Sequence, residues 1–441
     1  MTLHAPSRRQ LLLASGTLFA WAYLPKVARA EGRDPRLLVI VLRGALDGLA
    51  AVAPVGDPDW ASLRGDKGLA LDGKTPALPL NSFFALNPAM PNLHRLYKAG
   101  AATIVHAAAT PYRERSHFDG QDVLESGLGK PGATDTGWLN RALVALASEA
   151  SGQRDNPIVR APDTRPEPGS SARVSLQPAG RAGRGRDAFA VGPIAPLVVR
   201  GPAPVLSWTP RRLPPASEDT LMRLLDLYRH TDPALARVLE ERLGLATIAR
   251  AGGMDDQQPR AAGAGQVKAY FAESAGTAAK FLARADGPRI GALAFDGWDT
   301  HADEGTMSGR LAMLLGALDG ALAAIETEMK EAWRETVVAV VTEFGRTARI
   351  NGTEGTDHGT ATVALLAGGA LKGGRVVADW PGLKPANLHD GRDLKPTTDL
   401  RAVLKGLLKD HLRVDDAALA TKVFPDSGAV KPMAGLLATV A

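Results

Sequence analysis

Aspartate and histidine residues at the ends of predicted buried strands are the first candidates for chemistry in this chain. Five residues form this set: Asp47, Asp299, His301, Asp357 and His358. Carboxylate and imidazole donors together suit Zn²⁺, Mn²⁺ or a Zn/Mg-type pair. Two metal ions about 4 Å apart could stabilise both the attacking and the leaving oxygen of a displacement at phosphorus. The alternative is that these residues lie in loops that never meet, since Asp before Gly is common in turns.

Ser116 and three arginines could supply the rest of such chemistry. Ser116 stands at the predicted N-terminus of a helix, where backbone N–H groups favour an oxyanion or a phosphate-like group, and it is our candidate nucleophile. Capping of the helix is the competing interpretation, because Ser is a preferred N-cap residue. Arg113, Arg115 and Arg346 could neutralise the transferred group.

The strands that would position these residues share runs of apolar and β-branched residues with almost no alternation. That pattern is typical of strands covered on both faces. It occurs in residues 36–43, 101–106, 289–295, 336–342 and 361–366. Helical spacing of apolar residues occurs in 87–99, 138–147, 308–333 and 398–412. We therefore predict an α/β fold with a largely parallel sheet sandwiched by helices, whose strand ends bring the candidate residues to one edge.

A helical insertion is predicted at about 205–285. Its helical stretches are 218–229, 233–250 and 266–284. The preceding segment, 151–192, is rich in Arg, Gly and Pro and predicts a long excursion over the surface, either a lid or a tolerated insertion.

The first 30 residues have the features of a twin-arginine export signal. Arg8 and Arg9 precede the apolar run 11–24, and Ala28-Arg29-Ala30 has the A-x-A pattern of a cleavage site. We expect recognition by the twin-arginine export machinery, cleavage after Ala30 and a periplasmic or secreted protein that comprises residues 31–441. The apolar run is too short for a stable membrane span, and none is expected in the mature chain.

Charge and composition exclude several classes of function. Removal of the leader's four basic residues lowers the formal charge of the 441-residue chain from +5 to +1, so no nucleic-acid partner is expected. The chain contains no Cys, which rules out a thiolate nucleophile and Cys-ligated metals. No organic cofactor is expected.

Several motifs together resemble the exported proteins of the domain-of-unknown-function 1501 (DUF1501) family, over nearly the whole length. They are LRGALDGL (42–49), PYRERSHFDGQDVLESG (111–127), GWDTHADEG (297–305), TEFGRTARINGTEGTDHG (342–359), LLAGGALKGGRV (365–376), DWPGL (379–383) and DLKPTTDLRAVL (393–404). The family is similar to a branch of the alkaline phosphatase/sulfatase superfamily. This resemblance implies an alkaline phosphatase-like fold. It implies Asp47, Asp299, His301, Asp357 and His358 as metal ligands and Ser116 as nucleophile.

The expected function is that of an exported metal-dependent hydrolase of phosphate or sulfate esters, with a small anionic ester as substrate. The expected cofactor is a divalent metal, Zn²⁺ first, with Mn²⁺, Mg²⁺ or Ca²⁺ as alternatives. A formylglycine sulfatase is not expected, because Cys and a Ser-x-Pro-x-Arg motif are absent. The alternative is a non-catalytic periplasmic or envelope-associated binding protein that retains the fold, and a third option is a purely structural metal.

Overall fold

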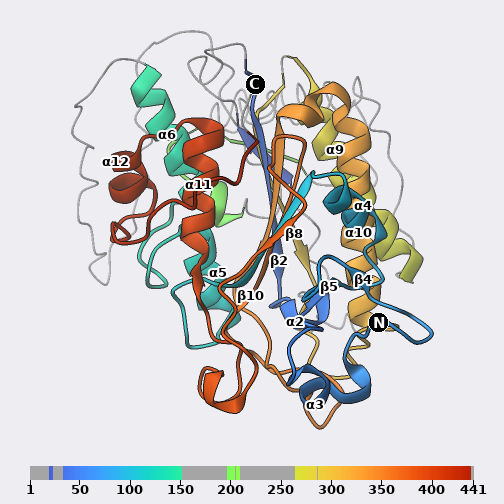
Figure 1. Ribbon diagram of the computed structural model, residues 1–441. Helices are drawn as coiled ribbons and strands as arrows, with labels where there is room; N and C mark the ends of the chain where they lie inside the picture. Colours follow the sequence, from blue (N-terminus) through green and yellow to red (C-terminus); the bar gives the residue numbers. More distant parts are fainter. Residues whose placement is uncertain are drawn as a thin grey trace, which may run out of the picture.

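A central β-sheet with helices on both faces organises the protein (Figure 1). The computed structural model describes residues 19–22, 33–150, 196–203, 205–208, 264–285 and 287–438. Within them, the sheet has nine strands in the order β11-β6-β10-β9-β2-β8-β1-β7, with β12 beside β6. The strands are β1 Phe19–Ala22, β2 Arg36–Arg43, β6 Ala102–Ala109, β7 Leu206–Trp208, β8 Ile290–Asp296, β9 Thr336–Thr342, β10 Thr362–Ala367, β11 Arg375–Val377 and β12 Thr398–Asp399. A small second sheet contains β3 Val52–Ala53, β5 Ala85–Leu86 and β4 Leu78–Pro79.

The sheet is mixed, with a parallel centre. β2 pairs in parallel with both β8 and β9, whereas β10 runs antiparallel to β9 and β6. In the register, Arg43 lies opposite Asp296 and Leu42 opposite Thr342, so the carboxyl ends of β2, β8 and β9 coincide at one edge. The predicted α/β class is therefore confirmed, and the loops after these three strands share that edge.

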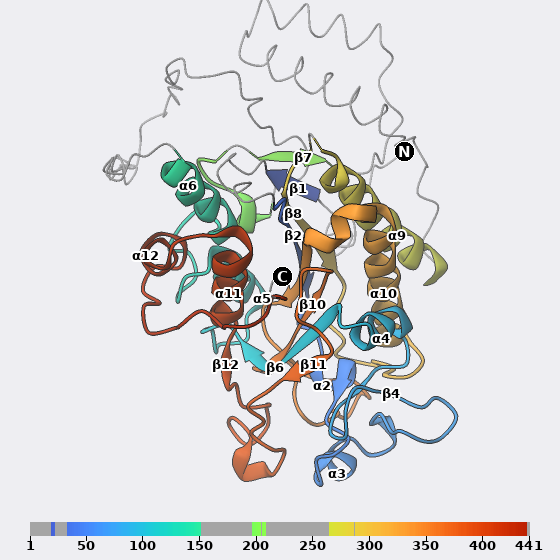
Figure 2. The same cartoon turned by 45° about the horizontal axis from the view of Figure 1, so that its top comes forward.

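Both faces of the sheet are buried, as the unbroken apolar runs predict. In β2, alternate residues Leu38, Ile40 and Leu42 point into one core, and the residues between them point into the other. The first core lies under α4 Pro91–Lys98, α9 Ala264–Ala283 and α10 Arg310–Met329. The second lies under α5 His117–Ser126, α6 Trp138–Ala150 and α11 Leu400–Leu412 (Figure 2).

Short helices and turns complete the described structure. They are α2 Gly48–Ala51, α3 Trp60–Arg64, α12 Asp416–Ala418, the 3-10 turns Gly65–Lys67, Leu197–Val199, Lys330–Glu335 and Pro385–Asn387, and a π-turn at Leu419–Val423. Within the part of the chain that the structure describes, no helix is both long and apolar enough to cross a bilayer.

The range predicted as an insertion contributes to the core itself. Helix α9 packs on the sheet, and Phe271 stacks on Phe295 of β8 with ring centroids 3.9 Å apart. The predicted helices at 218–229 and 233–250 lie outside the described residues, as does the excursion at 151–192. Within the predicted leader, β1 is described, and it pairs antiparallel with β8.

Candidate metal centre

Three segments meet beyond the carboxyl ends of the parallel strands. Asp299 follows β8, His358 lies in the loop between β9 and β10, and His117 is the first residue of α5. Each offers one ligand atom, and these atoms all lie within 4.8 Å of one another. The structure thus brings the predicted ligands Asp299 and His358 together with His117, a residue that was not predicted, and the predicted ligand His301 lies beside them.

The donor atoms surround one carboxylate oxygen. Asp299 Oδ1 lies 3.0 Å from His301 Nε2, 3.3 Å from His358 Nε2 and 3.4 Å from His117 Nε2. His301 Nε2 and His358 Nε2 are 2.9 Å apart. In a tetrahedral site with bonds of about 2.1 Å, ligand atoms are about 3.4 Å apart. The spacing and the chemistry of His117, Asp299 and His358 therefore fit a divalent metal ion, and His301 lies close enough to two of them to be a fourth donor.

The other ring nitrogen of each histidine faces an acceptor. His117 Nδ1 is 2.9 Å from Glu343 Oε1, His358 Nδ1 is 2.8 Å from the Arg115 carbonyl, and His301 Nδ1 is 3.5 Å from Asp357 Oδ1. With a metal ion bound, these acceptors would hold the proton on Nδ1 and leave each Nε2 lone pair for the ion. Metal-binding histidines commonly have this arrangement, because the outer acceptor orients the ring.

His117 Nε2 provides a further test of whether a metal fits. This atom is buried and makes no hydrogen bond to the described residues, and its 3.4 Å approach to Asp299 is not one. In the neutral imidazole with its proton on Nδ1, this nitrogen would be buried without a hydrogen bond, which carries a desolvation cost. Coordination to an ion among these donors would remove that cost.

The charged groups at the centre shift one another's pKa values. Burial alone would raise the pKa of the Asp299 carboxyl, but the His117 and His358 imidazoles and the Arg346 guanidinium hold that pKa well below its usual range. Burial alone would lower the pKa of His117, but Asp299 and Glu343 raise it to about 9. Without a metal ion, the imidazolium of His117 therefore compensates the two carboxylates, a role that a divalent cation would take over.

The centre is open to solvent. The side chain of His301 is 46% exposed and that of Asp299 is 40% exposed, whereas Glu343 behind His117 is fully buried. Structural zinc sites are closed by protein ligands, and catalytic sites keep a position for water or substrate. With four protein donors, an ion here would admit a small molecule by expanding to five-coordination, and the exposure on one side leaves room for that molecule. Asp357, which is 54% exposed, lies on the outer side of His301.

Asp47, a predicted ligand, lies in a different environment. Its carboxylate caps α2 by accepting from the backbone N–H groups of Leu49 and Ala50. It also accepts two bonds from the Arg64 guanidinium, at 2.6 and 3.0 Å, and both side chains are buried. The positive charge that a metal would supply to Asp47 is thus already supplied by Arg64, and Asp47 is not part of the cluster.

The predicted arginines are engaged in contacts within the protein. Arg113 donates to the carbonyl groups of Thr110 and Tyr112. Arg115 binds Asp390 and Asp393. Arg346 is buried and donates to Asp299 Oδ1 at 2.6 Å, so of the three guanidinium groups it is this one that contacts the centre.

Ser116 occupies the N-cap position of α5, directly before His117. Its side chain makes no capping hydrogen bond, and its backbone N–H donates to the Tyr112 hydroxyl at 3.1 Å. The Ser116 hydroxyl is therefore not used as a helix cap. Sequence reasoning considered Ser116 and missed His117, although a histidine beside a candidate nucleophile was a signal that could have been followed.

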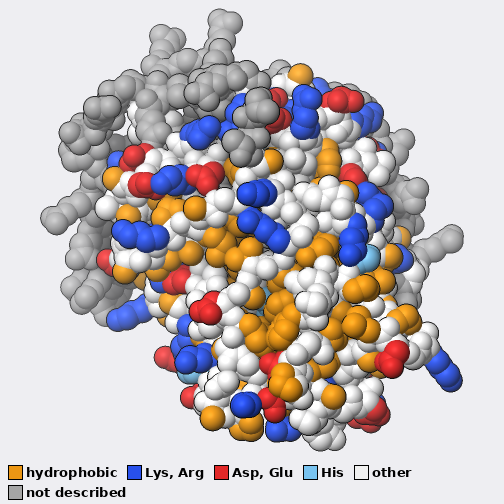
Figure 3. Space-filling view, viewed as in Figure 1, with side chains coloured by type: hydrophobic (Ala, Val, Ile, Leu, Met, Phe, Trp, Pro, Cys, Tyr) orange, Lys and Arg blue, Asp and Glu red, His pale blue; other side chains and the backbone are white. Residues whose placement is uncertain are grey.

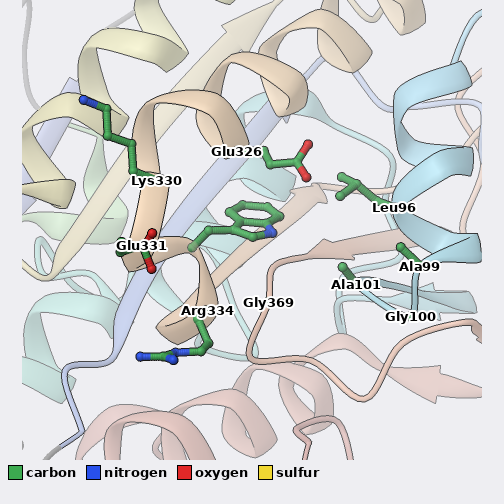
Figure 4. Close-up of a pocket in the computed structure, with 10 residues that line it drawn as sticks. Leu96, Ala99, Gly100, Ala101, Glu326, Lys330, Glu331, Arg334 and Gly369 are labelled. Atoms are coloured by element: carbon green, nitrogen blue, oxygen red, sulfur yellow. The ribbon is translucent and has the colours of Figure 1, made fainter.

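A hollow with a volume of about 430 Å³ lies at the opposite edge of the sheet (Figure 4). Its lining includes Leu96, Glu326, Lys330, Trp333 and Arg334. It contains no histidine and none of the predicted site residues, so it has no part in the metal centre.

Comparison with known proteins gives a family and no close relative. No curated protein matches the chain. A solved structure, titled "Crystal structure of Ps i-CgsB in complex with k-i-k-neocarrahexaose", matches with 9% identity and a TM-score of 0.36, over 87% of this chain and 73% of that chain. That score is too low to assign a shared fold. The family model described as "Protein of unknown function (DUF1501)" matches residues 199–424, about half of the sequence, and the chain therefore belongs to the DUF1501 family.

Proposed function

We propose that the protein is an exported metal-dependent hydrolase of phosphate or sulfate esters. One divalent ion would be held by His117, Asp299 and His358, with His301 as a fourth donor. The observation that carries the proposal is the approach of three imidazole Nε2 atoms to a single oxygen of Asp299. Three imidazoles and one carboxylate suit Zn²⁺ best among the common divalent ions.

Hydrolysis is supported by the open side of the centre and by the residues around it. A divalent ion supplies Lewis acidity, which polarises an ester oxygen and lowers the pKa of water. Arg346 orients the Asp299 carboxylate through its 2.6 Å hydrogen bond. The Ser116 hydroxyl, which makes no capping hydrogen bond, is the candidate nucleophile at the N-terminus of α5.

Export and a small substrate complete the proposal. The twin arginine Arg8-Arg9 and the Ala28-Arg29-Ala30 pattern support passage through the twin-arginine machinery to the periplasm or beyond. Lys and Arg are interspersed with Asp and Glu on the face shown in Figure 3. A basic stripe of the kind that binds nucleic acid is therefore not seen on this face.

Metal content and turnover of the exported protein test this proposal together. We expect about one divalent ion per chain by elemental analysis, and hydrolysis of p-nitrophenyl phosphate, its diester or p-nitrophenyl sulfate. His117→Ala should lose both the metal and the activity, whereas His94→Ala, a histidine of α4 outside the centre, should keep both.

The outcomes separate the candidate functions. Folded protein without metal and without turnover would refute the metallohydrolase. Bound metal without turnover on any of the three esters would refute hydrolysis and leave a binding or structural role for the ion.

A further inference from the structure

Beyond the histidines and their acceptors lies a buried carboxylate, Asp393, that joins two of the ligand-bearing segments. Its Oδ2 atom accepts hydrogen bonds from Thr360 Oγ1 at 2.8 Å and from Arg115 Nε and Nη2 at 3.0 and 2.8 Å. Thr360 is two residues after His358, and Arg115 is two residues before His117. A single oxygen atom therefore links the segments that carry two of the metal donors.

The backbone at Arg115 depends on this link. Its φ angle is +61°, in the left-handed region, which is unfavourable for a non-glycine residue. In this conformation the Arg115 carbonyl accepts from His358 Nδ1 at 2.8 Å. Such a conformation persists where surrounding contacts hold it. The bonds from the Arg115 guanidinium to Asp393 are contacts of this kind.

Asp393 is itself firmly placed. Its side chain is fully buried, and its backbone exchanges hydrogen bonds with His389 at 2.9 and 3.0 Å. A backbone bridge also connects it to Thr347 in the loop between β9 and β10. Asp390, the other partner of Arg115, is 57% exposed, and exposed ion pairs contribute little. Asp393 is therefore the partner that can hold Arg115 in place.

We infer that Asp393 is a positioning residue of the metal centre. It holds the Arg115 carbonyl against His358. It also fixes the position of His117, at the start of α5, relative to the loop that carries His358. This inference rests on the proposed metal centre. It assigns to Asp393 a role in metal affinity, with no contact to substrate.

Replacement of Asp393 by an isosteric amide tests the role. Asp393→Asn should weaken Zn²⁺ binding about tenfold, at the lower end of the range for outer partners of metal ligands, as measured by competition with a chromogenic chelator. It should also change the visible absorption spectrum of the Co²⁺-loaded protein, which reports the ligand geometry. The matched control is Asp399→Asn, which removes the charge that pairs with Arg401 at the start of α11; among the described residues, the side-chain hydrogen bonds of Asp399 all go to Arg401.

Each result has a clear consequence. An unchanged Zn²⁺ affinity and Co²⁺ spectrum in Asp393→Asn, with a wild type that binds metal, would overturn the inference and leave the metal centre standing. A wild type that binds no Zn²⁺ would overturn the proposed function and the inference with it. If Asp393→Asn does not fold, Thr360→Val removes one of the three bonds at a buried position, and an unchanged affinity there overturns the inference as well.

Discussion

At the scale of single residues, what surrounds a charged side chain decides what it can do. Asp299 and Asp47 both follow strands of the sheet, and both are bound by an arginine. Asp299 also faces three imidazole nitrogens on a side open to solvent. Asp47 is enclosed, with its oxygens taken by Arg64 and by the first turn of α2. Two aspartates that look equivalent in the sequence therefore have different roles.

Asp47→Asn distinguishes a structural role from a ligand role for this residue. The change leaves the Arg64 charge buried without its partner, which typically costs 3–5 kcal/mol. We expect the free energy of unfolding in urea to fall by about that amount, while the metal content per folded chain stays unchanged. A loss of metal from protein that remains folded would return Asp47 to the set of ligands.

At the scale of elements, the coinciding strand ends bring the site together, and two loops then pack against each other. The backbone N–H of Thr356 donates to the Thr300 carbonyl at 3.1 Å, and that of Glu304 donates to the Glu354 carbonyl at 3.0 Å. The loop that carries His358 is thereby held against the loop that carries Asp299. Close approach of these two backbones is possible because residue 355 is glycine.

Gly355→Ala tests this packing. A Cβ atom at Gly355 would lie well inside van der Waals contact with the carbonyl of His301 and the backbone nitrogen of Ala302. We expect a loss of about 1–3 kcal/mol in stability and weaker Zn²⁺ binding, because the two ligand loops must separate. The control is Gly352→Ala in the same loop, where a Cβ would meet nothing within 4 Å. Equal melting temperatures and Zn²⁺ affinities for the two variants would contradict this account.

At the scale of the whole molecule, buried histidines tie the layers to the sheet. His411 of α11 donates from Nε2 to the Arg36 carbonyl at 2.9 Å, and His106 of β6 donates to the Val52 carbonyl at 2.9 Å. Burial lowers the pKa of each imidazole to about 4, against the smaller opposing effect of these bonds. Both histidines are therefore neutral in the folded protein near pH 7.

Acid should destabilise the fold in a defined window. An unfolded histidine titrates near 6.5, so between pH 6.5 and about 4 the unfolded chain binds protons that the folded chain does not. Stability should fall as the pH falls through this window, by up to about 3 kcal/mol for each histidine. Urea unfolding from pH 7 to 4.5 should show a shallower loss for His411→Gln than for wild type. His94→Gln serves as the control, and identical pH slopes for all three proteins would contradict the assignment.

The sequence by itself determined the elements and part of the site. Unbroken apolar runs predicted β2, β8 and β9 to within one residue at each end, because a strand buried on both faces needs that pattern. Helical periodicity predicted α4, α6, α10 and α11, because a helix that covers a sheet needs one apolar face toward the core. Strand ends also pointed to Asp299, His301 and His358, which the structure brings together.

Only the tertiary structure decided the partners. His117 and its acceptor Glu343 are 226 residues apart, and Arg115 and Asp393 are 278 residues apart. Arg64 lies in a segment without clear periodicity, so nothing local marked it as the partner of Asp47. Helix α9 likewise has the pattern of any amphipathic helix, and its place in the core depends on the face of β8 that it covers. Local patterns reflect the burial of each element, whereas ligand sets and ion pairs depend on contacts that form only when distant segments pack.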